Sequence, residues 1–158
     1  MRATLHTILW LTLFAVCGTP AVAEPLRLSI VHVNDWDRLD ARDGAGGAAK
    51  IASIARYERD RAEADGGLML LTFGGDMLSP SLLSGFDKGA HMVDLANAIG
   101  FDAAVLGNHE FDFGPEVLMQ RLKEAKYPVL GSNISYKGKP GFPGAERSRM
   151  VTAGEYKI

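Results

Sequence analysis

The sequence has little of several features that would assign a protein to a specialised class. It contains one cysteine, Cys17, so an intrachain disulfide is excluded. Its 17 basic and 19 acidic residues leave a net charge of −2, which provides no positive field for a nucleic acid polymer. With 47% hydrophobic and 23% charged residues, the 158-residue chain has the composition of one globular domain of modest size.

Long hydrophobic runs are also missing, with one short exception near the N-terminus. Arg2 precedes an apolar core at residues 8–16, and the small residues Ala21-Val-Ala23 follow it, which is the pattern of a cleaved signal peptide over residues 1–23. The run is shorter than the roughly 20 residues that span a bilayer, so no stable membrane anchor is expected. We therefore predict a periplasmic or secreted protein whose folded part is residues 24–158.

Strand-like and helix-like segments alternate along the rest of the chain. This alternation predicts an α/β fold with a mainly parallel sheet and flanking helices. The apolar run at residues 68–73 is typical of a strand covered on both faces. The predicted strands are residues 26–33, 68–73, 103–106 and 128–131, and the predicted helices are residues 48–64, 90–99 and 115–126.

Polar side chains follow three of the predicted strands. Asp35 comes after the first strand, Asp76 after the second, and Asn108 with His109 after the third. In an open parallel sheet the loops at the carboxyl ends of the strands converge on one edge, so residues about 40 and 32 positions apart come within a few ångströms of each other. That proximity suits two metal ions about 3.5–4 Å apart that share a carboxylate.

Each of these signals has a plainer explanation when it stands alone. An aspartate just past a strand, such as Asp35, is usually a turn former or a helix cap. Gly74-Gly75-Asp76 is by itself a common tight turn. The segment from Phe101 to Asp112 is more specific, because it joins a buried strand to an amide oxygen ligand, a histidine, and a carboxylate that can orient the imidazole.

The Gly-Asn-His-Glu sequence at residues 107–110 resembles the signature of the calcineurin-like metallophosphoesterases, and in particular of the 5′-nucleotidase family. Residues 28–35 and 73–76 are similar to that family's first two metal-binding segments. The resemblance implies a layered α/β/β/α sandwich, of which residues 24–158 would form the first half. It also implies hydrolysis of nucleotides by a dinuclear metal centre at which hydroxide attacks phosphorus, with an activity like that of 5′-nucleotidases and 2′,3′-cyclic phosphodiesterases.

The resemblance also implies roles for individual residues. Asp35, Asp37, Asp76 and Asn108 would bind two divalent metal ions (Mn, Zn, Mg or Ca). His109 and Asp112 would be catalytic, and Asn108 and His109 would contact the substrate. The family usually has a histidine where this chain has Asp37, so this residue either replaces that ligand, which favours harder ions than zinc, or only solvates a loop.

Further histidine ligands and a base-binding C-terminal domain, which the family carries later in its sequence, are not found in these 158 residues. The resemblance therefore implies an N-terminal, apparently truncated portion with little or no turnover, whose missing C-terminal half would lie in the full-length product. Two other functions stay open. One is a non-catalytic module that binds metal or phosphate, and the other is a dimetal hydrolase of a different ester, such as that of a sulfur-oxyanion carrier.

Overall fold

A computed structural model describes residues 25–158 apart from residues 42 and 45. The predicted signal peptide, residues 1–23, lies outside the described residues. Among the helices of the described part, none is both long enough and apolar enough to cross a membrane.

Four parallel strands form the central sheet, as the alternating pattern predicted. They lie side by side in chain order: β1 (Leu28–Val33), β2 (Leu68–Phe73), β3 (Ala103–Val105) and β4 (Val129–Leu130). The long β1–β2 pairing aligns Leu28 with Leu68 and Val33 with Phe73, so both strands end at the same edge. The last two strands are shorter than predicted, since β3 ends at Val105 and β4 has two residues.

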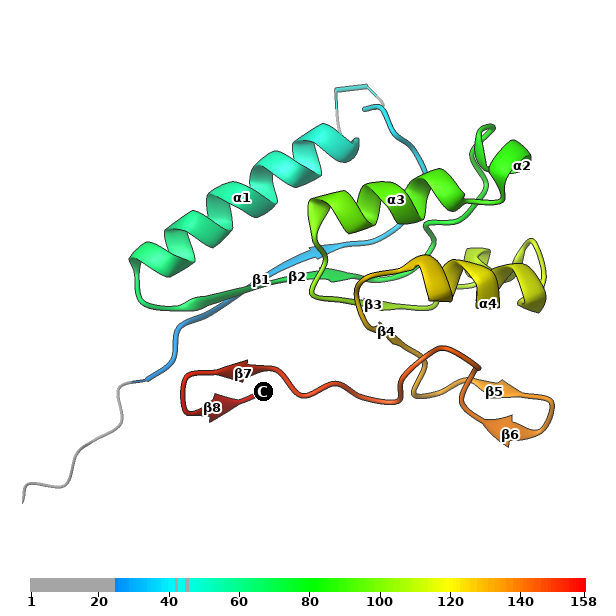
Figure 1. The fold of residues 1–158 in the computed structure, drawn as a ribbon. Helices are drawn as coiled ribbons and strands as arrows, with labels where there is room; N and C mark the ends of the chain where they lie inside the picture. The colour runs from blue at the N-terminus through cyan, green and yellow to red at the C-terminus, as the bar shows by residue number, and fades with distance from the viewer. Residues whose placement is uncertain (1–24, 42, 45) are drawn as a thin grey trace, which may run out of the picture.

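The three long helices cover one face of this sheet (Figure 1). They are α1 (Ala48–Ala64), α3 (Ala90–Ile99) and α4 (Pro115–Glu124). Parallel strands added in chain order through right-handed crossovers place every connecting helix on the same side, which accounts for the single helical layer. Two short elements were not predicted, the helix α2 (Ser84–Asp87) and the 3-10 helix η1 (His109–Phe111).

The core lies between the sheet and the helices. Its centre is a group of aromatic rings in which Phe73 meets Phe101 edge to face at 5.6 Å and Trp36 at 6.5 Å. Met92 and Ala96 of α3 are fully buried against the sheet, as the spacing of apolar residues on this helix predicted. The core therefore packs the segment just before β3 against the carboxyl end of β2 and the loop after β1.

The opposite face of the sheet is much less covered. On β2, Met69, Leu71 and Phe73 are buried, whereas the alternate residues are only half-buried, so the prediction that this strand is covered on both faces is wrong for the described part of the chain. On β1, Ile30 is 61% exposed. Alternation of side chains between the two faces of a strand explains the pattern, because the helices pack on one face only.

Two small antiparallel hairpins follow the sheet, and neither was predicted. The first pairs β5 (Ser135–Tyr136) with β6 (Lys139–Pro140), and the second pairs β7 (Thr152–Ala153) with β8 (Tyr156–Lys157). Both lie on the side of the sheet away from the helices in Figure 1. Strands of two residues carry too short a hydrophobic pattern to be recognised in a sequence.

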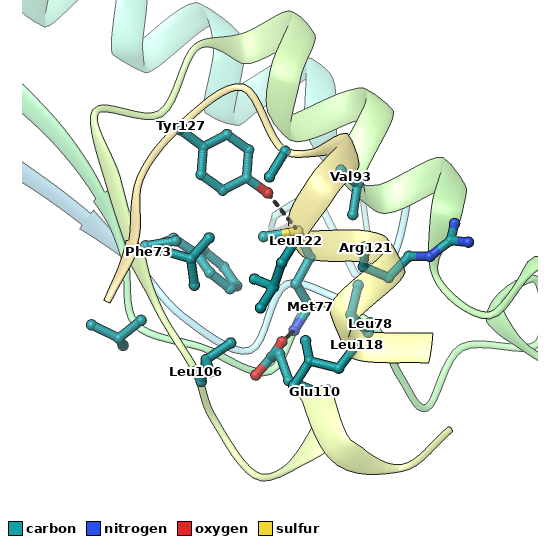
Figure 2. A pocket seen from close by; sticks show the side chains of 14 residues that line it. Phe73, Met77, Leu78, Val93, Leu106, Glu110, Leu118, Arg121, Leu122 and Tyr127 are labelled. Carbon is teal, nitrogen blue, oxygen red and sulfur yellow. Dashed lines mark hydrogen bonds between the residues drawn. The ribbon is translucent and has the colours of Figure 1, made fainter. Parts of the chain in front are cut away.

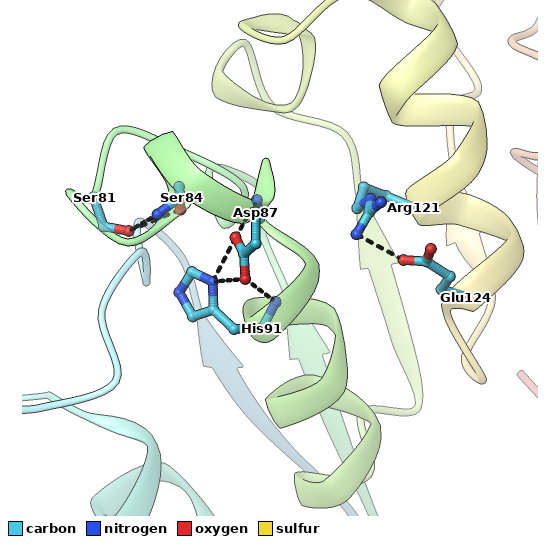
Figure 3. A network of polar contacts seen from close by, with 7 residues as sticks. Ser81, Ser84, Asp87, His91, Arg121 and Glu124 are labelled. Carbon is cyan, nitrogen blue, oxygen red and sulfur yellow. Dashed lines mark hydrogen bonds and ion pairs between the residues drawn. The ribbon is translucent and has the colours of Figure 1, made fainter.

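The start of α3 gives a prediction about stability. Its N-cap, Gly89, has no side chain, and Asp87 instead accepts hydrogen bonds from the backbone N–H groups of Gly89 and His91 and from the His91 ring (Figure 3). Burial alone would raise the pKa of Asp87, but the hydrogen bonds from the side chain and backbone of His91 outweigh it and lower this pKa below 3.8. Asp87→Ala should therefore cost about 1 kcal/mol of unfolding free energy at neutral pH.

The pH dependence follows from the sign of this shift. A carboxylate with a lowered pKa stabilises the fold above its unfolded value of 3.8, and the stabilisation is lost as the pH falls through the folded value. The difference between wild type and Asp87→Ala in urea denaturation should therefore be larger at about pH 7 than at about pH 3. Asp87→Asn, which keeps an acceptor oxygen, should lose less than Asp87→Ala. An equal difference at both pH values would contradict this account.

Candidate functional site

The loops after β1, β2 and β3 lie side by side at the carboxyl edge of the sheet. The backbone N–H of Asp35 donates to the carbonyl of Gly75 at 3.1 Å, which joins the first loop to the second. The backbone N–H of His109 donates to Oδ1 of Asp76 at 2.8 Å, which joins the second loop to the third. The three segments that carry the predicted site residues are thus direct neighbours.

The two aspartates at this edge share an uncommon backbone conformation. Asp35 has φ 53° and Asp76 has φ 67°, both in the left-handed region that residues other than glycine seldom adopt. Such conformations are costly, and they persist where the surroundings enforce them, often at functional sites. This feature could not be predicted from the sequence, because aspartate after a strand is common in ordinary turns.

Glycines allow the loops to approach one another this closely. A Cβ atom at Gly75, which has φ +100°, would lie 2.6 Å from the backbone nitrogen of Gly107. A Cβ atom at Gly107 would overlap Oδ1 of Asp76 and would lie 2.8 Å from the backbone nitrogen of Asp76. Neither distance is possible for real atoms, so any other residue at either position would push the second and third loops apart.

Trp36 anchors the first loop. Its side chain is 4% exposed and packs against Phe73 and Phe101, and its indole N–H donates to the carbonyl of Arg38 at 2.6 Å. Asp35 and Asp37 flank the buried ring in sequence, and both line an open hollow of about 420 Å³. Asp35 is exposed, whereas the side chain of Asp37 is 19% exposed. Sequence reasoning missed this role, although a tryptophan between two acidic residues was a usable signal.

His109 and Asp112 form a pair, as their spacing suggested. Nδ1 of His109 donates to Oδ2 of Asp112 at 2.7 Å, and the buried hydroxyl of Ser79 donates to the same carboxylate oxygen. The hydrogen bond from His109 and that from Ser79 lower the pKa of Asp112. The bond to Asp112 in turn raises the pKa of His109, against a smaller opposing effect of burial. Ser79 was not identified from the sequence, since its approach depends on the folded loop after β2.

The donors proposed for metal ions are oxygen atoms, which suit hard or borderline cations. Among the described residues, no three side chains of His, Cys, Asp or Glu gather closely enough to hold a metal ion. Oδ1 of Asp76 accepts the hydrogen bond from the backbone N–H of His109. Asp35 accepts a hydrogen bond from the side-chain amide of Asn34. Oδ1 of Asp37 lies 3.8 Å from Nε of Arg38. The loops are therefore adjacent, but each carboxylate contacts a nearby polar group of the protein.

Comparison with known proteins gives the same family as the motifs. No protein-family model matches the chain. It is 37% identical over 129 residues to the 5′-nucleotidase of Bos taurus, a match that covers 73% of this chain and 22% of that protein. The chain thus spans about a fifth of the length of this curated relative.

Solved structures with the same fold include two bacterial proteins. The NAD nucleotidase of Haemophilus influenzae matches with a TM-score of 0.71 and 27% identity, over 82% of this chain and 28% of that one. The sulfate thiohydrolase SoxB of Thermus thermophilus matches with a TM-score of 0.62 and 30% identity, over 71% of this chain and 20% of that one. The chain therefore belongs to the 5′-nucleotidase family of calcineurin-like phosphoesterases, and it matches the N-terminal part of their phosphoesterase domain.

Proposed function

We propose that this protein is a metal-dependent phosphoester hydrolase of the 5′-nucleotidase type that acts on nucleotides. The observation that carries the proposal is the adjacency of three polar loops at one sheet edge, with Asp35 and Asp76 both held at positive φ. The names of the relatives, a 5′-nucleotidase and an NAD nucleotidase, support nucleotides as the substrate class. The signal-like N-terminus supports action in the periplasm or outside the cell.

Four residues would hold two divalent cations. Asp76, at the centre of the three loops, would bridge them, Asp35 and Asp37 would complete one, and Asn108 would bind the other through its amide oxygen. When bound, the cations would make a water molecule nucleophilic and neutralise charge on the phosphoryl oxygens. The donors that these four residues supply are all oxygen atoms, which by themselves favour Mn²⁺, Mg²⁺ or Ca²⁺ over Zn²⁺.

His109 and Asp112 would donate a proton to the leaving group or stabilise the negative charge on the phosphoryl oxygens. The hydrogen bonds of Asp112 with His109 and Ser79 fix the imidazole and leave its Nε2 for the substrate. A protonated Nε2 can donate to a phosphoryl oxygen or protonate the leaving alkoxide. The raised pKa of His109 keeps more of this ring protonated near neutral pH, which suits both tasks.

An activity assay tests the proposal. Phosphate release from a nucleoside monophosphate, a 2′,3′-cyclic nucleotide and an aryl phosphate is to be measured with Mn²⁺ and with a chelator. Because three carboxylates and one amide are too few ligands for two cations, we expect the 158-residue polypeptide to bind Mn²⁺ weakly and to show little or no turnover. A longer product of the same reading frame, if it supplies further histidine ligands, should show Mn²⁺-dependent turnover on nucleotides. Turnover that survives chelation would contradict the proposal.

Two alternative functions are each favoured by one observation. The match to SoxB favours an ester of a sulfur oxyanion, and hydrolysis of such an ester without hydrolysis of nucleotides would decide for it. The lack of a three-residue cluster among the described His, Cys, Asp and Glu side chains favours a non-catalytic module. A reading frame that stops after codon 158, together with Mn²⁺ binding but no hydrolysis, would decide for that second alternative.

A further inference from the structure

Glu110 is a buried carboxylate that the mechanism above does not use. It lies in η1, next to His109, and is 5% exposed. Figure 2 shows its carboxylate turned inward toward the backbone nitrogen of Met77, within the apolar surroundings of Leu106 and Leu118. A buried polar group at such a place is costly unless its hydrogen bonds are made.

Both oxygens of this carboxylate bind backbone N–H groups from two different loops. Oε2 accepts from Asp76 at 2.8 Å and from Gly107 at 2.6 Å, and Oε1 accepts from Met77 at 2.7 Å. One side chain thus joins the loop after β2 to the loop after β3. A further hydrogen bond, from the backbone N–H of His109 to Oδ1 of Asp76, joins the same two loops. In this bond the carboxylate belongs to the loop after β2 and the N–H group to the loop after β3.

The position of these bonds relates them to the proposed metal ligands. Asp76 is itself one of the residues whose N–H is held, and Gly107 immediately precedes Asn108. The separation between Asp76 and Asn108 therefore depends on a carboxylate of fixed length between their backbones. Gly75 and Gly107 already bring the two loops into backbone contact. The closely packed neighbours therefore cannot compensate for a change of about a few tenths of an ångström in the separation between Asp76 and Asn108.

We propose that Glu110 is a positioning residue, whose carboxylate sets the spacing of Asp76 and Asn108 for binding divalent cations. The proposal rests on the proposed function, since it assigns these two residues to metal. Glu110 does not bind the cation itself, because both of its oxygens are buried against N–H groups of the protein. Residues that orient metal ligands typically change metal affinity about 10- to 100-fold when they are replaced.

The first test needs no variant and no metal. Hydrogen exchange of individual amides, followed by NMR in the metal-free protein, should show slow exchange at Asp76, Met77 and Gly107. Exchange at the rate of an unprotected peptide at these three amides would overturn the proposal, whatever the protein's activity.

The second test replaces Glu110 with a side chain of the same shape. In Glu110→Gln one oxygen becomes an NH₂ group, which faces an N–H group and cannot accept its hydrogen bond. The amides of Asp76, Met77 and Gly107 should then exchange faster, and the affinity for Mn²⁺, measured by calorimetry, should fall about 10- to 100-fold. Glu63→Gln, at an exposed position of α1, is the matched control and should change neither quantity.

A second control separates positioning from stability. Met69 is buried at the opposite end of β2, so Met69→Ala should lower the melting temperature while leaving Mn²⁺ affinity unchanged. An equal loss of affinity in Met69→Ala and Glu110→Gln would overturn the proposal, as would an unchanged affinity in Glu110→Gln. If the three amides are protected while a longer product of the reading frame, with the further histidine ligands, binds no Mn²⁺, the connection between the loops stands and the proposed function fails.

Discussion

Asp76→Ala is expected to lower Mn²⁺ affinity by more than about 100-fold, because it removes the carboxylate proposed to bridge both cations. The substitution has two further effects that must be separated from this one. It removes the acceptor of the His109 N–H, and it places alanine at φ 67°, a conformation that costs about 1–2 kcal/mol for a residue without a locally bonding side chain. Calorimetric titration with Mn²⁺ measures the affinity, and thermal unfolding measures the cost to the fold.

Asp76→Asn is the matched control for these effects. Asparagine tolerates the left-handed conformation and keeps an oxygen for the N–H of His109, but it carries no negative charge. It should therefore retain most of the stability while losing most of the Mn²⁺ affinity. If Asp76→Asn bound Mn²⁺ as tightly as the wild type, a bridging role for Asp76 would be wrong.

His109→Ala is expected to lower turnover by about 10²- to 10⁴-fold while leaving Mn²⁺ affinity nearly unchanged. Alanine keeps the backbone N–H that contacts Asp76, so this substitution removes the imidazole without removing the link between the loops. Affinity and turnover can both be measured on the longest product of the reading frame that hydrolyses nucleotides.

Ser79→Ala supports the same assignment with a smaller effect. It removes one of the two bonds to Asp112 and leaves the bond from His109 in place. Turnover should fall less than in His109→Ala. A loss of Mn²⁺ affinity in His109→Ala comparable to that in Asp76→Ala would show that the division between metal ligands and proton donor is incorrect.

Much of the fold could be read from the sequence, because its main elements have strong local signals. The helices at residues 48–64 and 90–99 and the strand at residues 68–73 have the predicted ends. Gly100 ends α3 in the left-handed conformation expected of a glycine cap. The short elements α2, η1 and the two hairpins were missed, since their hydrogen bonds and tertiary surroundings determine them more than any repeating pattern does.

The candidate site was predictable in outline and not in detail. Parallel strands that end in register make the meeting of three loops a consequence of topology, so sequence alone could place Asp35, Asp76 and Asn108 at one edge. The positive φ angles, the close contact at Gly107 and the inward turn of Glu110 depend on backbone positions in different loops. No pattern within a single segment encodes such features.

The proposed metal centre can be tested most directly with a crystal of a longer product of the same reading frame, one that supplies the further histidine ligands, soaked in Mn²⁺. The anomalous signal of manganese identifies each bound ion without reference to activity. The account predicts ions at the carboxyl edge of the sheet, with oxygens of Asp76 shared between two peaks about 3.5–4 Å apart and with Asp35 and Asn108 on either side. Manganese bound only at other surfaces, or none within coordinating distance of Asp76, would contradict it.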